Sequence, residues 1–132
     1  HERGHVVAEF DDELRNQISR IMKSLGLSLH ESGTYIQTQG PRFETPAEAK
    51  MLADYGDCVG MTAASELIIA SQMNINYATL CSVDNYVNGI AKTRITLERF
   101  REAVKAHESE VKRAVLRLLE GIADINRKDI LS

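Results

Sequence analysis

The sequence lacks the features on which several large classes of protein depend. No apolar run is long enough to span a bilayer, and the beginning of the chain has neither the basic start nor the apolar middle of a signal peptide. The net charge is only −3, so no basic field is available to attract nucleic acid or an anionic membrane. We therefore expect a cytoplasmic protein that binds neither nucleic acid nor membranes.

Cysteine and histidine are scarce as well. The two cysteines, Cys58 and Cys81, lie inside apolar runs without the spacing of metal ligands, which predicts buried and reduced thiols. The four histidines form neither a metal-binding pattern nor a Ser/His/Asp pattern. We therefore expect no bound metal and no histidine-centred triad.

What the sequence does contain is typical of a compact unit of the α/β class. It has 132 residues, 43% of them hydrophobic, and no repeats or linker-like tracts. Helices are predicted from a cap at Asp11 or Asp12 to Gly26, from Thr62 to 73 and from Thr96 to about Ile125, and strands over 34–39, 57–60 and 77–84. This alternation predicts a sheet with helices packed on it, and ligands of such sheets bind at the carboxyl ends of the strands.

Proline is nearly absent, and both prolines lie in residues 39–51, QGPRFETPAEAKM. Residues 45–48, Thr-Pro-Ala-Glu, have the signature of a capping box and predict a helix that runs to about Asp54. The capping box does not explain Arg42, Phe43 and Glu44, which precede it. An aromatic face beside a carboxylate can stack a flat heterocycle and accept a hydrogen bond from its ring N–H. The alternative is a core phenylalanine flanked by solvated charges.

Two further motifs follow predicted strands, and each has two interpretations. In DCVGMTAASE a helix begins at Thr62, whose hydroxyl and neighbouring N–H groups would form an anion site, unless Thr62 is simply the N-cap. In CSVDNYVNGI, Asp84 and Asn85 would offer a carboxylate or an amide to a ligand, unless they form a turn. Each motif taken by itself leaves the choice open.

Taken in order, three segments resemble the purine nucleoside phosphorylase and 5′-methylthioadenosine phosphorylase family. They are GTYIQTQGPRFETPAEAKML, GDCVGMTAASELIIA and YATLCSVDNYVNGI, and the likeness runs from about His5 to Phe100. The resemblance implies a three-layer αβα mixed sheet and phosphorolysis, a pentosyltransferase reaction that yields a free purine and a ribose 1-phosphate. It further implies inorganic phosphate as co-substrate, no other cofactor, and a homo-oligomer, either a trimer or a hexamer.

The resemblance also assigns roles to particular residues. Thr62 resembles the family's phosphate-contacting hydroxyl, and Met61 the residue packed against the ribose. Phe43 resembles the aromatic residue that lies along the purine ring, with Glu44 next to it. Asn85 falls where the family places its hydrogen bond to the base, near the ring nitrogen that gains charge as the base departs, and is therefore the predicted catalytic residue.

Base specificity is predicted from Glu44 and Asn85. Family members that act on 6-oxopurines tend to have Glu and Asn at these places, whereas adenine-directed members have a small residue and Asp, with a second Asp where Val87 stands here. A carboxylate can accept from N1–H of inosine or guanosine, but N1 of adenine carries no hydrogen. The sequence therefore favours a 6-oxopurine base, with 5′-methylthioadenosine as the alternative substrate.

The prediction for the part of the site that contacts the sugar rests on a weaker resemblance. Leu97 and Phe100 lie where enzymes for 5′-hydroxyl sugars place a histidine, and an apolar lining suits a 5′-methylthio group. Both residues are also explained as core positions of the last helix, so methylthio and hydroxyl sugars stay open. His5 resembles the residue that one subunit contributes to the active site of its neighbour.

One half of the family's pattern has no counterpart in these residues. The glycine-rich loop after the family's first strand, and an Arg and a His that bind phosphate, are not matched. The resemblance thus implies that residues 1–132 are the C-terminal portion of a single nucleoside phosphorylase domain, inactive until an N-terminal half is supplied. Two alternatives stay open: a non-catalytic fragment for purine binding or assembly, and hydrolysis in place of phosphorolysis.

Overall fold

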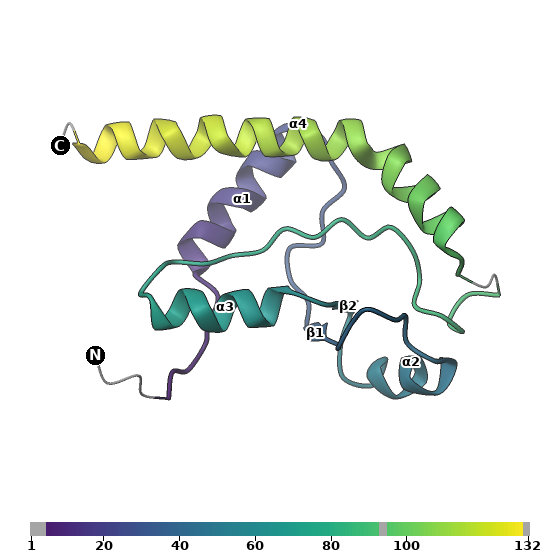
Figure 1. The fold of residues 1–132 in the computed structure, drawn as a ribbon. Helices are drawn as coiled ribbons and strands as arrows, with labels where there is room; N and C mark the ends of the chain where they lie inside the picture. Colours follow the sequence, from purple (N-terminus) through teal and green to yellow (C-terminus); the bar gives the residue numbers. More distant parts are fainter. Residues whose placement is uncertain (1–4, 93–94, 131–132) are drawn as a thin grey trace.

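The computed structural model describes residues 5–92 and 95–130 and has a mixed α/β fold (Figure 1). Its elements are α1 (Asp12–Ser24), β1 (Tyr35–Gln37), α2 (Pro46–Leu52), β2 (Cys58–Gly60), α3 (Ala63–Gln72) and α4 (Leu97–Ile130). The two strands form a small parallel sheet, in the register Tyr35↔Cys58, Ile36↔Val59 and Gln37↔Gly60. The predicted α/β class is therefore confirmed, with strands shorter than the predicted ones.

Glycine permits the two strands and the chain around them to approach closely. A Cβ atom on Gly56 would lie 2.6 Å from Cδ1 of Ile36, and one on Gly60 would collide with the ring and hydroxyl of Tyr35. The tyrosine side chain therefore lies across the end of β2. This packing carries its phenol oxygen to the point where α3 begins.

The predicted strand over 77–84 is wrong. The segment is extended but forms no strand. Among the described residues the sheet consists of β1 and β2, and this segment pairs with neither of them. It is instead fastened at Tyr77, whose carbonyl accepts from Asp11 N–H at 2.8 Å and whose hydroxyl donates to Glu66 at 2.6 Å. Burial and this bond to Glu66 raise the pKa of Tyr77 to about 12. An apolar composition alone therefore does not make a strand.

The same segment corrects the prediction for the cysteines. Cys81 is exposed and Cys58 is half-buried, and both are free thiols. Burial raises the pKa of the Cys58 thiol, with smaller contributions from nearby Cys81 and Asp57. The burial predicted for Cys81 required a strand that does not form.

The helices follow their local signals closely. Asp11 caps α1 by accepting from Leu14 N–H at 2.7 Å, and Thr45 and Glu48 form the complete capping box of α2. The last predicted helix is confirmed as α4, which continues five residues past the predicted end at Ile125, to Ile130. In Figure 1 it bends partway along its length and crosses α1. No helix among the described residues is both long enough and apolar enough to cross a membrane.

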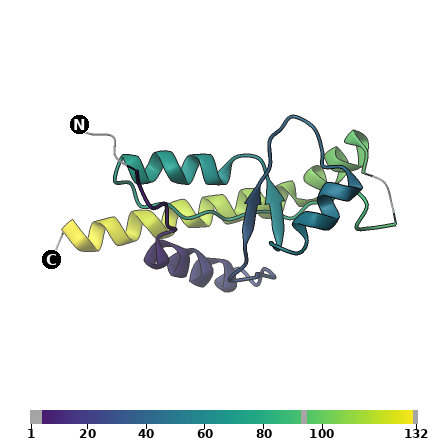
Figure 2. The same ribbon diagram turned by 90° about the horizontal axis from the view of Figure 1, so that it is seen from below.

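The core is divided: Ala49 is buried in α2, and the other buried apolar side chains of the described residues form two small groups. One is between α1 and α4, where Met22 and Ala114 are buried, and the other surrounds the inner face of α3, where Ala63, Leu67 and Ala70 are buried. The outer face of α3 is also apolar, and Ile68 and Ile69 on it are exposed. Seen from below, α2 lies at the opposite end from residues 5–11 and the last turns of α4 (Figure 2).

Met22 should contribute more to stability than any exposed methionine, because its side chain is only 2% exposed. Replacing it with Ala is expected to lower the free energy of unfolding by about 2–5 kcal/mol, through lost apolar burial and the cavity left behind. Met51→Ala in α2 is the matched control, since Met51 is exposed, and it should change the value by less than about 0.5 kcal/mol. Chemical denaturation of the three proteins measures this, and equal losses for both variants would contradict the packing described.

Candidate ligand-binding site

The carboxyl ends of β1 and β2 lie side by side because the strands are parallel, and the turns that follow them pack together. Thr38 continues the ladder beyond β1, donating its N–H to the Gly60 carbonyl at 2.9 Å. A Cβ atom on Gly40 would come within 2.8 Å of the Met61 sulfur, so the two turns meet closely and a larger residue here would displace the Met61 side chain. Met61, predicted to contact a ribose, is thereby placed beside the turn that leads to Phe43 and Glu44.

Glu44 is buried, with only 8% of its surface exposed. One carboxylate oxygen accepts from the Thr38 hydroxyl at 2.5 Å, and its main-chain carbonyl accepts from the Asn88 side-chain amide at 3.2 Å. The residue is therefore held both through its side chain and through its backbone. The sequence motif indicates Glu44, but neither of these two partners was predicted from it.

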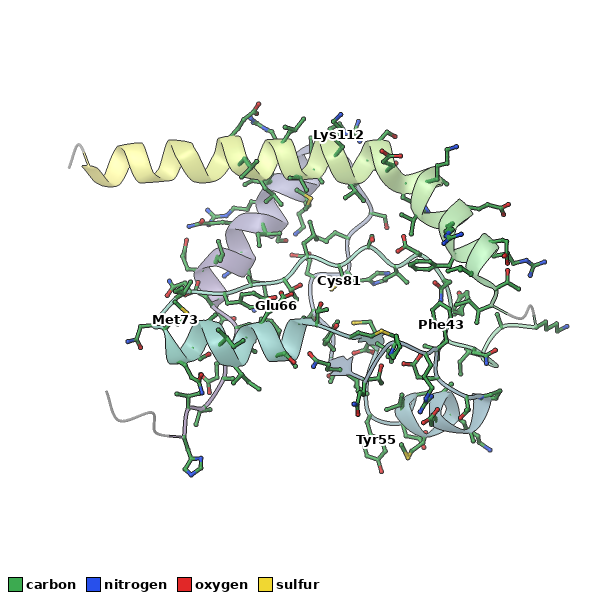
Figure 3. The ribbon with its side chains drawn as sticks, viewed as in Figure 1. Phe43, Tyr55, Glu66, Met73, Cys81 and Lys112 are labelled. Atoms are coloured by element: carbon green, nitrogen blue, oxygen red, sulfur yellow. The ribbon has the colours of Figure 1, made fainter. Side chains whose placement is uncertain are left out.

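Phe43 lies next to Glu44 and is partly exposed. Its ring meets that of Phe100 edge to face, with 6.0 Å between ring centroids and 62° between planes. Figure 3 shows Phe43 beside the first turns of α4, which also carry Leu97. Phe43, which is predicted to stack on a base, thus contacts Phe100, which is predicted to line a 5′ group. Leu97, the other residue predicted to line that group, is exposed one turn away.

An ion pair braces the turn that presents Phe43 and Glu44. The Arg42 guanidinium donates to both oxygens of Glu48, at 2.8 and 2.7 Å, and Thr45 donates its N–H and hydroxyl to the same carboxylate at 2.8 and 2.9 Å. Arg42, followed by Thr45, lowers the pKa of Glu48 to about 2, and Glu48 in turn raises the pKa of Arg42. This explains why an arginine stands so close to the capping box.

The Glu48 interaction should make stability depend on pH in acid. Because the folded-state pKa is about 2 and the ordinary value is 4.5, the contribution is complete above about pH 4.5 and is lost as the pH falls towards 2. Glu48→Gln should remove this part of the dependence, so that parent and variant converge as the pH falls through this window. Thermal unfolding from pH 2 to 6 measures it; a constant difference between the two proteins across that range would contradict the assignment.

Side chains of β1 cap the first turn of α3. The Tyr35 hydroxyl lies 3.4 Å from the N–H groups of both Thr62 and Ala63, and the Gln37 side-chain oxygen accepts from Ser65 N–H at 2.9 Å. The Thr62 hydroxyl itself makes no capping hydrogen bond, although Thr62 occupies the N-cap position. Tyr35 and Gln37 were not predicted for this role; they are two residues apart in β1, so their side chains point to the same face of the strand.

Asn85 is exposed and lies in the loop before α4. Its side-chain amide donates to the Tyr86 carbonyl at 2.9 Å. The loop is held against the start of α2 by Asn88 and by Gly89, where a Cβ atom would come within 2.6 Å of Pro46. Gly89 has φ of +89°, which only glycine adopts readily. These contacts bring the Asn85 loop to the same turn as Glu44.

His5 is not brought to these residues. It is exposed, and Figures 1 and 2 both show the segment that follows residue 4 at the end of the molecule away from α2. Its predicted role concerns a neighbouring subunit and stays a prediction. In the described part of the chain, no group of three or more His, Cys, Asp or Glu side chains is arranged to hold a metal ion.

A buried carboxylate beside an aromatic ring, at the carboxyl edge of parallel strands, is the arrangement of an α/β protein that binds a small ligand. Residues 2–120 match the family model described as the phosphorylase superfamily. The chain belongs to this superfamily, and the family resemblance of its three motifs is confirmed.

Several curated relatives are similar to the chain. It is 38% identical over 107 residues to a probable 6-oxopurine nucleoside phosphorylase of Archaeoglobus fulgidus, covering 80% of this chain and 44% of the relative. It is 37% identical over 103 residues to a probable S-methyl-5′-thioinosine phosphorylase of Methanocaldococcus jannaschii, covering 78% and 40%. It is 31% identical over 115 residues to an S-methyl-5′-thioadenosine phosphorylase of Pyrococcus abyssi, covering 87% and 44%. The chain spans less than half the length of these relatives.

Proposed function

We propose that the protein containing this chain catalyses phosphorolysis of purine nucleosides, and that this chain supplies the purine-binding side of the site. The observation that carries the proposal is the buried Glu44 beside Phe43, at the edge where both strands end. In the reaction an oxygen of inorganic phosphate bonds to the anomeric carbon, and the bond from that carbon to the purine nitrogen breaks. The products are a free purine, which takes up a proton, and a ribose 1-phosphate derivative.

Each part of the substrate is assigned a contact. The ring of Phe43 stacks on the base, and Met61 packs against the ribose. Asn85 swings its amide from Tyr86 to the purine nitrogen that gains electron density, which stabilises the leaving group. Thr62 contributes its hydroxyl to phosphate, which is the only co-substrate proposed, with no further cofactor. Since Tyr35 and Gln37 already engage the first turn of α3, most phosphate contacts must come from elsewhere in the protein.

The favoured base is a 6-oxopurine. Glu44 offers a buried acceptor, which suits an N1–H and meets only a lone pair on N1 of adenine. The names of the relatives from Archaeoglobus and Methanocaldococcus, a 6-oxopurine and a thioinosine phosphorylase, are consistent with this choice. The alternative substrate is 5′-methylthioadenosine, in line with the name of the Pyrococcus relative.

The sugar carries either a 5′-methylthio or a 5′-hydroxyl group. The contact between Phe43 and Phe100 supports an apolar lining that continues from the base to the sugar, with Leu97 exposed beside it. Such a lining favours the methylthio group, because burying a hydroxyl there without a partner would cost free energy.

We also propose the setting in which this site works. Residues 1–132 form the C-terminal portion of a single nucleoside phosphorylase domain, whose complete sheet is a three-layer αβα mixed sheet. The other portion is part of the same protein or a separate N-terminal half. The domain assembles as a trimer or hexamer in the cytoplasm, with His5 contributed to a neighbouring active site, and neither nucleic acid nor membrane is a partner. The small parallel sheet and the exposed apolar face of α3 support an incomplete unit.

A second candidate is a purine-binding or assembly fragment without catalysis. It is favoured by the contrast between the two ends of the site in the described residues. Side chains for the base lie close together, whereas the N–H groups that begin α3 are engaged by β1. Such a fragment would bind purine and release none from a nucleoside, even when the remaining half is added.

Product analysis tests the function. The chain, alone and together with a polypeptide that supplies the rest of the domain, is incubated with inosine, guanosine, 5′-methylthioinosine and 5′-methylthioadenosine, with and without phosphate. Phosphate-dependent release of hypoxanthine or guanine is the expected result. Equal release without phosphate would establish hydrolysis instead, and binding without any release would favour the second candidate. Adenine as the main product would overturn the base assignment.

A further inference from the structure

Thr38 occupies an unusual place between the sheet and the candidate site. Its N–H extends the β ladder to the Gly60 carbonyl, which fixes its backbone. Its hydroxyl lies 2.5 Å from the Glu44 carboxylate and 3.5 Å from the same Gly60 carbonyl. A hydroxyl has one proton to donate, and the shorter distance to a charged acceptor decides that the proton goes to Glu44.

The bond from Thr38 commits one oxygen of Glu44 and leaves the other as an acceptor. Arg42 donates instead to both oxygens of Glu48 and to the Phe43 carbonyl, and its hydrogen bonds in the described part of the chain do not include Glu44. Asn88 holds the main-chain carbonyl of Glu44 and so fixes the backbone from which the side chain extends, while Thr38 holds the carboxylate itself. The second oxygen of this largely buried residue is therefore an acceptor that a donor on a ligand can use.

We propose that Thr38 is a positioning residue that sets the base specificity of the site. By fixing one oxygen of Glu44, Thr38 presents the other oxygen as an acceptor. This acceptor favours a purine with N1–H and disfavours a purine whose N1 has no hydrogen. This inference rests on the proposed function, since it assumes that Glu44 faces a purine. It concerns a residue that makes no direct contact with the base.

The test compares Thr38→Val with Thr38→Ser, which keeps the hydroxyl. Binding of hypoxanthine and of adenine is measured by calorimetry under the condition in which the unmodified chain binds hypoxanthine, alone or with the rest of the domain supplied. Thr38→Val should reduce the preference for hypoxanthine about tenfold, through loss of a charge-assisted hydrogen bond. Thr38→Ser should stay within about twofold of the parent. Thr34→Val, an identical change at an exposed position just before β1, is the control and should leave the preference unchanged.

A second measurement shows whether Thr38 acts through Glu44. In a Glu44→Gln background, Thr38→Val should cause no further loss of preference, and the two changes should be non-additive in their effect on the denaturation midpoint. Additive effects, or a normal preference in Thr38→Val, would overturn the inference while the proposed function stands. Absence of hypoxanthine binding by the parent under every condition would overturn the proposed function, and with it the role given to Thr38.

Discussion

Replacing Glu44 with Gln is expected to lower kcat/KM for 6-oxopurine nucleosides about 100-fold. Under the proposed function, the buried carboxylate accepts a charge-assisted hydrogen bond from N1–H of the bound base, and a neutral amide oxygen accepts a weaker one. The neutral amide can still present an oxygen, but without the charge and with an N–H₂ group that Thr38 cannot satisfy in the same way. Kinetics of inosine and 5′-methylthioinosine, with the rest of the domain supplied, measure the loss.

The loss should be specific to the base. The efficiency with 5′-methylthioadenosine should fall less, or rise, because an amide N–H₂ can donate to N1 of adenine. Glu102→Gln on the exposed surface of α4 is the matched control and should leave both efficiencies unchanged. Equal losses for the two bases in Glu44→Gln would show that Glu44 supports the structure and does not read the base.

Replacing Phe43 with Ala is expected to weaken binding of the purine 10- to 100-fold. Under the proposed function, the ring stacks on the base, and a stacked base contributes about 1–3 kcal/mol when it is measured by alanine substitution. The change also removes the edge-to-face contact with Phe100, so some stability should be lost as well. Dissociation constants for hypoxanthine and denaturation midpoints, measured on the same samples, separate the two effects.

Two further variants distinguish stacking from packing at this position. Phe43→Tyr keeps an aromatic face and should bind hypoxanthine within about threefold of the parent. Phe100→Ala removes the ring contact but leaves the stacking face of Phe43, so it should lower stability more than it weakens base binding. If Phe43→Ala were as stable as the parent and bound hypoxanthine equally well, the role given to Phe43 would be wrong.

Features fixed by neighbouring residues could be predicted from the sequence. The capping box at Thr45 and Glu48, the cap at Asp11 and the long apolar stripe of α4 each depend on contacts within a few residues or one helical face. The segment 77–84 could not, because a strand exists only where another strand offers its main-chain groups. Its apolar composition predicts a strand, yet the segment pairs with neither β1 nor β2 and Val83 is exposed.

The site could be predicted in part for the same reason. Phe43 and Glu44 stand together in the sequence, so their pairing needed no knowledge of the fold. Their supports come from far along the chain: Asn88 holds the carbonyl of Glu44, and Phe100 meets the ring of Phe43. Thr38 is nearer to Glu44 in the sequence, and a polar residue at the end of a strand shortly before a carboxylate can indicate their contact. The direction of its hydroxyl, however, depends on the turn between the two residues.

The most direct test of the central claim is a crystal structure of the chain, alone or with the rest of its domain, bound to hypoxanthine. The expected result is a purine lying against the ring of Phe43, with N1 within hydrogen-bonding distance of the Glu44 carboxylate oxygen that Thr38 leaves available. Hypoxanthine bound elsewhere, or bound here with N1 turned away from Glu44, would contradict the claim that this turn holds and reads a purine.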